Sequence, residues 1–369
     1  MNGKRIYQLM KSLIENDLHA AVFNPGPNLS YLTGLNFHLS ERPIVLIISQ
    51  SALPLIVLPE LEAPKLQDAN IQFEGITYTD NPETWQKAFI QAADAAGLSG
   101  KKVAVDENEL RVLELRLLES AMQDANFVSF AAGLAELRIC KDEAEIALMQ
   151  QAVVIAEEAF KAIHNSICAG ITEKALAAEL TMQLYRYGSD PELPFQLHVS
   201  SGENSASPHA MPTDRKLQNG DLVLFDWGAR YQGYCSDITR TIAIGAISDE
   251  LKRVYEVVLQ ANQAGREAAR AGVPAGEVDQ AARAVIDNQG YGDYFVHRLG
   301  HGLGLQGHEP PYLFSGSEKL LRAGMTHTIE PGIYLPGVGG VRIEDDVVIT
   351  ETGCRLLTRL DRSLFIIGR

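Results

Sequence analysis

Short apolar runs alternate with amphipathic stretches along residues 1–132. The apolar runs are rich in Val, Ile and Leu, which favour β-strands, and they cover residues 18–23, 43–48, 53–58 and 101–105. Stretches with apolar residues at helical spacing lie between them, at residues 5–16, 82–96 and 109–120. This alternation predicts a small α/β domain in the N-terminal part of the chain.

Longer helical patterns follow, beginning with an amphipathic stretch at residues 141–167. Thr172 is placed to cap a second helix that Gly188 ends, and Ser248 is placed to cap a third that Gly272 closes. A further helix is predicted at residues 277–289, and strands are predicted at residues 221–228, 234–245, 324–334 and 341–350. We therefore predict an α/β domain at 1–132 and an α+β domain at 133–369.

Length and charge narrow the class of protein. A chain of 369 residues is long for a single core, and its net charge of −15 argues against nucleic acid or an anionic membrane as partner. No apolar run approaches the roughly 20 residues that span a bilayer, and the polar start does not resemble a signal peptide. The four cysteines form no Cys-x-x-Cys pair, so we expect reduced thiols and a cytoplasmic location.

Five residues are candidates for a metal centre, namely Asp226, Asp237, His301, Glu330 and Glu344. Each lies in an apolar or glycine-rich stretch; Asp226, for example, directly follows the run Leu-Val-Leu-Phe. An isolated buried carboxylate costs several kcal/mol, so it normally finds a cation or loses its charge. Two divalent cations would balance four carboxylates, and oxygen-rich ligation with one His suits Mn, Co or Zn.

The spacing of the acidic residues predicts how the chain brings them together. Asp226 and Asp237 flank a segment with Gly and Tyr that suits a hairpin, and Glu330 and Glu344 flank a segment rich in Gly and Pro. Each pair can thus come from two neighbouring antiparallel strands. His301 stands between glycines, which let the backbone approach an ion closely. Two metals about 3.5–4 Å apart would lower the pKa of a bridging water and polarise a carbonyl.

The motifs around these residues resemble those of the metal-dependent Xaa-Pro peptidases, prolidase and aminopeptidase P, which are relatives of methionine aminopeptidase. They are NGDLVLFDWG at 219–228, GYCSDITRT at 233–241, GHGLG at 300–304, HEP at 308–310, TIEPGIY at 328–334 and VRIEDD at 341–346. The resemblance covers residues 137–365 well, and the N-terminal part more loosely through NPGPN at 24–28 and YLTG at 31–34. It implies a C-terminal pita-bread domain with a curved antiparallel sheet flanked by helices, after a smaller creatinase-like α/β domain.

The resemblance also implies a role for each metal ligand. Asp226 and Asp237 would bind one metal ion, His301 and Glu330 would complete the site of the second, and Asp237 and Glu344 would bridge the two. Glu330 would in addition act as the base that takes a proton from the bridging water.

Three further residues match family positions around the substrate. His308 would contact the substrate carbonyl and the tetrahedral intermediate, and His209 would lie near the scissile bond. Arg342 would either orient a ligand carboxylate such as Asp226 or touch the substrate. His297 and His327 are expected to be structural, although the family usually has an apolar residue where His327 stands.

The implied function is a dinuclear-metal hydrolase that cleaves the bond between an N-terminal residue and proline through a metal-bridging hydroxide. The substrate is a small peptide with proline at its second position, and the protein is expected to be a homodimer. Manganese is the expected cofactor, two ions per chain, while Co, Zn and Fe accept the same ligands. Dipeptidase and aminopeptidase both stay open; Tyr312, where some dipeptidases have Arg, weakens the strict dipeptidase interpretation.

Other classes of function are available on the same scaffold. A creatinase-like C–N hydrolase that does not act on peptides, and a non-catalytic binding module, are the main alternatives, and a methionine aminopeptidase fits the motifs less well. Metal content separates them, because two bound ions favour hydrolysis and none favours a binding module.

Overall fold

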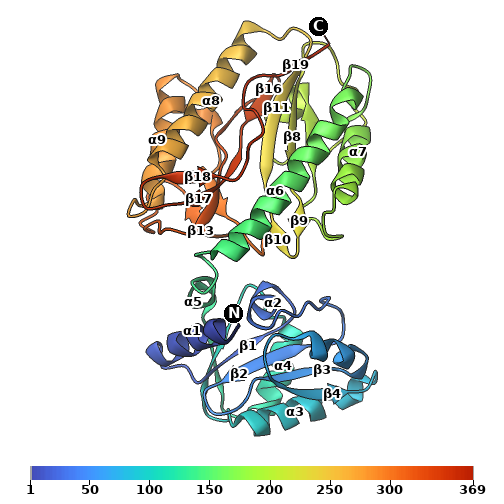
Figure 1. Ribbon diagram of the computed structural model, residues 1–369, viewed down its shortest axis with the longest axis vertical. Coiled ribbons are helices and arrows are strands. Elements are labelled where there is room, and N and C mark those ends of the chain that lie inside the picture. Colours follow the sequence, from blue (N-terminus) through green and yellow to red (C-terminus); the bar gives the residue numbers. More distant parts are fainter. Residues whose placement is uncertain (1, 369) are drawn as a thin grey trace. The chain divides into compact units, whose positions relative to one another are not determined.

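The computed structural model describes residues 2–368, which divide after Arg138 into two compact units (Figure 1). The first and last residues of the predicted domains, Met1 and Arg369, lie outside the described residues. Each unit has its own sheets and core, so the two are described in turn.

The N-terminal unit is built on a six-stranded sheet with the order β4-β3-β2-β1-β5-β6. Its strands are β1 (Ala20–Phe23), β2 (Val45–Ser49), β3 (Leu55–Pro59), β4 (Glu74–Tyr78), β5 (Lys102–Val105) and β6 (Asn126–Ser129). Its helices are α1 (Asn2–Glu15), α2 (Pro27–Thr33), α3 (Trp85–Ala96), α4 (Val112–Ala121) and α5 (Ala131–Ala135), with 3-10 segments η1 (Glu60–Asp68) and η2 (Pro82–Thr84). The predicted α/β class is thus confirmed for this unit.

Two strands and two short helices of this unit were not predicted. Strands β4 and β6 lie at the two edges of the sheet, and both keep exposed positions. Because an edge strand buries few side chains, its apolar alternation is weak and its sequence does not stand out. Helix α2 is only seven residues long and α5 only five, too short for a helical period to show.

The C-terminal unit contains a four-stranded sheet, β19-β11-β8-β7, and a five-stranded sheet, β13-β12-β14-β17-β18. The first consists of β7 (His198–Ser201), β8 (Leu222–Trp227), β11 (Ile238–Ile244) and β19 (Ile366–Ile367), and the second of β12 (Gly300–Gly302), β13 (Glu309–Leu313), β14 (Thr326–Ile329), β17 (Asp345–Ile349) and β18 (Cys354–Leu356). Two small hairpins pair β9 (Arg230–Tyr231) with β10 (Tyr234–Cys235), and β15 (Gly332–Leu335) with β16 (Gly339–Arg342).

Helices cover these sheets and build two apolar cores. They are α6 (Glu143–Ile163), α7 (Glu173–Arg186), α8 (Asp249–Ala268) and α9 (Ala275–Asn288), with 3-10 segments η3 (His164–Ser166), η4 (Gly202–Ala206) and η5 (Gly292–Tyr294). One core joins α6 and α7 to β8 and β11, and the other joins α8 and α9 to the strands from β14 to β17 (Figure 1). The predicted N-caps are confirmed, because Thr172 accepts from the Ala175 amide and Ser248 from the Leu251 amide. The predicted end at Gly272 is wrong, because α8 ends at Ala268 and Ala269 is its C-cap.

The predicted strands 324–334 and 341–350 are wrong as continuous elements, because each is interrupted. Strand β14 ends at Ile329 and β15 starts at Gly332, while β16 ends at Arg342 and β17 starts at Asp345. Pro331 has no N–H group and cannot continue a ladder, so the pairing breaks there. The register is nevertheless kept across the break, since Ile329 opposes Asp345 and Gly332 opposes Arg342.

Candidate metal centre

The first acidic pair is delivered by neighbouring antiparallel strands, as predicted. Asp226 lies near the end of β8, opposite Thr239 of β11, and Asp237 directly precedes β11. The Asp237 backbone N–H donates to Asp346 Oδ2 at 2.9 Å, which fixes the start of the strand.

The second acidic pair stands in the break of the β14–β17 hairpin. Since the register is the same on both sides of the break, Glu330 and Glu344 occupy opposed positions. The Glu330 N–H donates to Leu299 O at 2.9 Å, and the Glu344 N–H donates to Thr239 O at 3.1 Å. Both backbones are therefore tied to other strands or loops rather than to each other.

His301 reaches the same place from β12, where a glycine precedes and follows it. A Cβ atom at Gly300 would lie 2.2 Å from Thr328 O, and one at Gly302 would lie 2.3 Å from Pro310 O. The glycines thus let β12 approach its neighbours closely. The His301 Nδ1 atom lies 3.0 Å from Gly302 O, so Nδ1 carries the proton and the Nε2 lone pair faces the carboxylates.

The ligand atoms converge. Asp237, His301 and Glu344 each offer one ligand atom, and these atoms all lie within 4.8 Å of one another. His301 Nε2 lies 3.6 Å from Asp237 Oδ2 and 3.3 Å from Glu330 Oε1. All three clustered residues are buried, with at most 4 % of their surface exposed.

The electrostatics of the cluster fit divalent cations. Burial, together with the neighbouring carboxylates, raises the pKa of Asp237 and of Glu344 well above the usual range, and burial raises the pKa of Glu330 to about 7. Burial also lowers the pKa of His301, so the imidazole is neutral and its lone pair is available. Asp226 Oδ1 is buried and has no hydrogen-bond partner among residues 2–368. Cations at this place would relieve the repulsion and satisfy that oxygen.

Arg342 orients the ligands, which was one of the two roles expected for it. Its Nη2 donates to Asp226 Oδ2 at 2.5 Å, and its Nε donates to Thr239 Oγ1 at 3.0 Å. Thr239 Oγ1 in turn donates to Glu344 Oε2 at 2.6 Å. One guanidinium therefore holds Asp226 directly and Glu344 through a hydroxyl.

Tyr334 and His297 extend the hydrogen-bond network around Arg342. Arg342 Nη1 donates to the Tyr334 hydroxyl at 2.8 Å, and that hydroxyl lies 2.9 Å from His297 Nε2. Burial lowers the pKa of His297 to about 3, so its unprotonated Nε2 accepts the hydroxyl proton. Sequence patterns did not indicate Tyr334, whose position shows only once β15 and β16 are paired.

A cavity of about 390 Å³ opens over the centre and brings all the predicted site residues together. Its lining comprises Phe195, His198, Pro208, His209, Asp226, Asp237, His297, Arg298, His301, His308, Glu330, Arg342 and Glu344. His308 stacks on His301 with ring centroids 3.8 Å apart, and burial lowers its pKa. His209 is exposed at the cavity, where its ring faces that of His198.

Five lining residues were not among the predicted site residues. They are Phe195, His198, Pro208, Arg298 and His297, the last of which was expected to be structural. The Arg298 guanidinium lies 4.4 Å from the ring centroid of Tyr312. His327, in contrast, is fully buried in β14 and lies outside the cavity lining.

Comparisons with known proteins show the family to which this chain belongs. The profile of metallopeptidase family M24 matches residues 147–351, and the profile of the creatinase/prolidase N-terminal domain matches residues 5–140. The fold and site thus define a metal-dependent peptidase. The chain belongs to metallopeptidase family M24, and the predicted family resemblance is confirmed.

Relatives match along the whole chain. A Xaa-Pro dipeptidase of Lactobacillus helveticus is 36% identical over 368 residues, which cover 100% of this chain and 99% of that protein. The structure of a dipeptidase from Pyrococcus horikoshii OT3 is similar with a TM-score of 0.93 and 38% identity, covering 98% of this chain and 100% of the other. A prolidase structure from Thermococcus sibiricus gives 0.94 and 35%, covering 100% and 99%. These likenesses confirm the predicted pita-bread fold class.

Proposed function

We propose that this protein is a Xaa-Pro dipeptidase that works with two divalent cations. The observation that carries the proposal is the convergence of Asp226, Asp237, His301, Glu330 and Glu344 on one cavity, with a buried carboxylate oxygen that has no protein partner. The full-length relatives named as Xaa-Pro dipeptidase and prolidase support the choice of substrate.

The ligand roles follow the positions of the side chains. Asp226 and Asp237 would hold one cation, His301 and Glu330 the other, and Asp237 and Glu344 would contact both. When bound, such a pair lowers the pKa of a water molecule and polarises a carbonyl oxygen. Arg342 keeps Asp226 in place directly and Glu344 through Thr239, and it also donates to the Tyr334 hydroxyl.

Residues that line the cavity carry out proton transfer and contact the substrate. Glu330 accepts a proton on a carboxylate oxygen and delivers it to the leaving proline nitrogen, which has no N–H of its own in the peptide. His308, neutral at pH 7 because burial and Arg298 lower its pKa, donates a hydrogen bond to the substrate carbonyl oxygen. His209 contacts the substrate from the exposed side of the cavity.

Arg298 favours a dipeptide over a longer peptide. No carboxylate of the described residues forms an ion pair with its guanidinium, which faces the cavity beside the ring of Tyr312. A guanidinium binds a carboxylate through two parallel hydrogen bonds, and a dipeptide carries a carboxylate on its proline. Arg298 thus supplies a cation for the substrate carboxylate. In this chain Tyr312 stands where some dipeptidases of the family have an arginine.

Manganese, a homodimer and a cytoplasmic location complete the proposal. The ligand set is rich in oxygen, with one imidazole and no thiolate, which suits Mn. All four cysteines are free, as expected in a reducing compartment. None of the helices in residues 2–368 is both long and apolar enough to cross a membrane. The homodimer rests on the family resemblance, and light scattering tests it.

The deciding experiment uses metal-stripped protein resupplied with Mn, Co, Zn or Fe. Ala-Pro, Ala-Pro-amide and Ala-Pro-Ala are offered under each condition, and release of alanine is measured. We expect Ala-Pro to be cleaved best, with Mn most active. Preference for Ala-Pro-Ala would indicate an aminopeptidase. Two bound ions without cleavage of any proline peptide would favour a creatinase-like hydrolase, and no bound ions a binding module.

A further inference from the structure

One buried amide on helix α8 contacts the chain on both sides of the metal centre. Asn262 is fully buried, and its Nδ2 lies 3.1 Å from Ile329 O and 3.2 Å from Ile343 O. These carbonyls directly precede Glu330 and Glu344. We propose that Asn262 is a positioning residue that sets the spacing between these two glutamates for the metal ions. The proposal rests on the function proposed above.

The interruption of the hairpin explains why a side chain is needed to set the spacing between the two glutamates. Pro331 cannot donate a hydrogen bond, so the β-ladder does not fix the spacing between Glu330 and Glu344. The nearest backbone contact in the break, from the Ile343 N–H to Pro331 O, is long at 3.4 Å. The Asn262 amide bridges the break from the α8 side instead.

The orientation of the amide is itself fixed by its neighbours. Asn262 Oδ1 accepts from Arg266 Nε at 2.8 Å, and Nδ2 also donates to Asp345 Oδ2 at 3.1 Å. The two N–H groups of Nδ2 are shared among Ile329 O, Ile343 O and Asp345 Oδ2. Because a cation donor faces the oxygen and acceptors face the nitrogen, only this amide orientation fits the partners. The donor therefore points at the two carbonyls.

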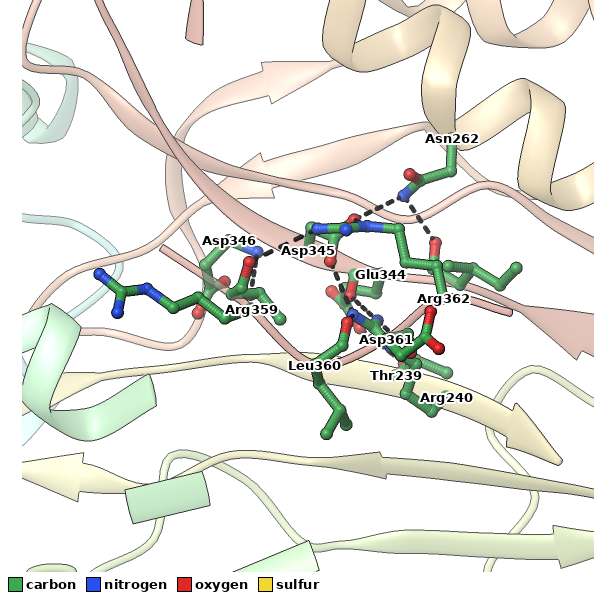
Figure 2. A network of polar contacts seen from close by, with 12 residues as sticks. Thr239, Arg240, Asn262, Glu344, Asp345, Asp346, Arg359, Leu360, Asp361 and Arg362 are labelled. Carbon is green, nitrogen blue, oxygen red and sulfur yellow. Dashed lines mark hydrogen bonds and ion pairs between the residues drawn. The ribbon is translucent and has the colours of Figure 1, made fainter. Parts of the chain in front are cut away.

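Asp345 and Arg240 extend the same network to Glu344 itself (Figure 2). Arg240 Nη2 donates to Asp345 Oδ1 at 2.9 Å, and Arg240 Nη1 donates to Glu344 O at 2.6 Å. The remaining N–H groups of Arg240 reach backbone oxygens of Thr239, Leu360 and Asp361. All five N–H groups of Arg240 thus have acceptors, and the side chain is only 3 % exposed. The carbonyls before and after the Glu344 side chain are thus both held by buried donors.

Metal affinity and metal spectroscopy test the proposal without substrate. Asn262→Leu keeps the number and branching of the side-chain heavy atoms, removes the amide and adds no charge. Partners that orient metal ligands typically contribute about 10–100-fold to metal affinity. We expect at least about 10-fold weaker Mn binding, and a changed visible absorption spectrum of the Co-loaded protein.

A matched control removes a comparable contact elsewhere in the unit. Gln150→Met deletes a side-chain hydrogen bond from α6 to Leu357 O, a carbonyl that is not next to either glutamate in the chain. Its Mn affinity should stay within about twofold of the unsubstituted protein, with the same Co spectrum. If Asn262→Leu does not fold by circular dichroism, Asn262→Ser, which leaves room for water, is measured in its place.

Wild-type metal affinity and an unchanged Co spectrum in the folded Asn262 variant would overturn the proposal. An equal loss in Gln150→Met would overturn it as well, because the effect would then reflect general destabilisation. Failure of the unsubstituted, Mn-loaded protein to cleave Ala-Pro would instead reject the proposed function, while the Asn262 readouts would keep their meaning.

Discussion

Buried charge decides the chemistry at the scale of single residues. Asp237 and Glu344 are acidic groups whose pKa values burial and mutual repulsion raise. Among residues 2–368, Arg342 is the one Arg or Lys that forms an ion pair with a candidate ligand, Asp226. A site of this kind costs stability unless cations enter it. The presence of these buried carboxylates in the fold therefore favours a metal-dependent function.

Asp237→Ala should abolish turnover of Ala-Pro and reduce the metal content below two ions per chain, because Asp237 would contact both ions. Metal content is measured by atomic emission after gel filtration in Mn. Asp94→Asn, at an exposed position of α3, should change neither quantity. A fully metallated, active Asp237→Ala protein would refute the bridging role.

His308→Ala should lower kcat for Ala-Pro by about 10²–10⁴-fold while the protein keeps its metal, since the lost imidazole donates to the substrate oxygen rather than to an ion. His164→Ala removes a histidine whose ring packs edge-on against Phe365, outside the cavity lining, and it serves as the control. Steady-state kinetics and metal analysis on the same samples check this. An unchanged kcat would reject the assigned role.

At the scale of elements, the positions of the candidate ligands depend on where the strands end. Glu330 and Glu344 stand in a break of the β14–β17 hairpin, and His301 stands on a strand of three residues between glycines. Irregular backbone at these points lets three strands and a loop bring their side chains to one place. This arrangement requires β12 to lie close to its neighbouring strands. It also requires hydrogen bonds from outside the β-ladder to hold the hairpin break.

Gly302→Ala tests the close approach of β12 to β13. The added Cβ would lie 2.3 Å from Pro310 O, so the backbone beside His301 must shift. We expect a loss of about 1–3 kcal/mol in the free energy of unfolding and weaker Mn binding. Gly353→Ala adds a Cβ in open space and is the matched control. Denaturant unfolding and metal titration measure both; equal behaviour of the two variants would contradict this interpretation.

At the scale of the whole molecule, the metal centre joins the halves of the C-terminal unit. Asp226 and Asp237 come from the four-stranded sheet, whereas His301 and Glu330 come from the five-stranded sheet and its loops. Cations held by both groups would therefore cross-link the sheets. Metal should stabilise the folded protein by mass action, because the unfolded chain does not present the ligands together.

This stabilisation should depend on pH. Burial raises the pKa of Glu330 to about 7, from an ordinary value of 4.5. Between these values the metal-free folded protein binds a proton that the unfolded chain releases, so its stability falls as the pH rises. Cations favour the ionised carboxylate and remove this loss. The difference in Tm between metal-loaded and metal-free protein should therefore grow from about pH 5 to about pH 7.5.

Calorimetry of both forms across that pH range measures the difference in Tm. Contributions from groups that do not contact the metal cancel in this difference. The comparison needs metal-free samples kept in chelator and loaded samples kept in excess Mn. A difference in Tm that is constant or shrinks as the pH rises would contradict the assigned protonation of Glu330.

The sequence predicted the elements that bury a full apolar face. Strands β1 and β8 and helices α6 and α8 carry long apolar patterns and were found where expected. The break at Pro331 was missed, because the apolar pattern continues through residues whose backbone leaves the ladder. Local periodicity reports which residues are buried, but it does not report where a backbone hydrogen bond is lost.

The amino-acid sequence by itself determined the ligand chemistry, because acidic groups and a histidine in apolar, glycine-rich motifs leave few other ways to satisfy their charge. Only the tertiary structure decided what surrounds them: Arg342 on Asp226, Asn262 across the hairpin break, and Arg298 and His198 at the cavity. These contacts join residues far apart in the chain. Side-chain partners of that kind depend on strand register and helix placement, which no local pattern encodes.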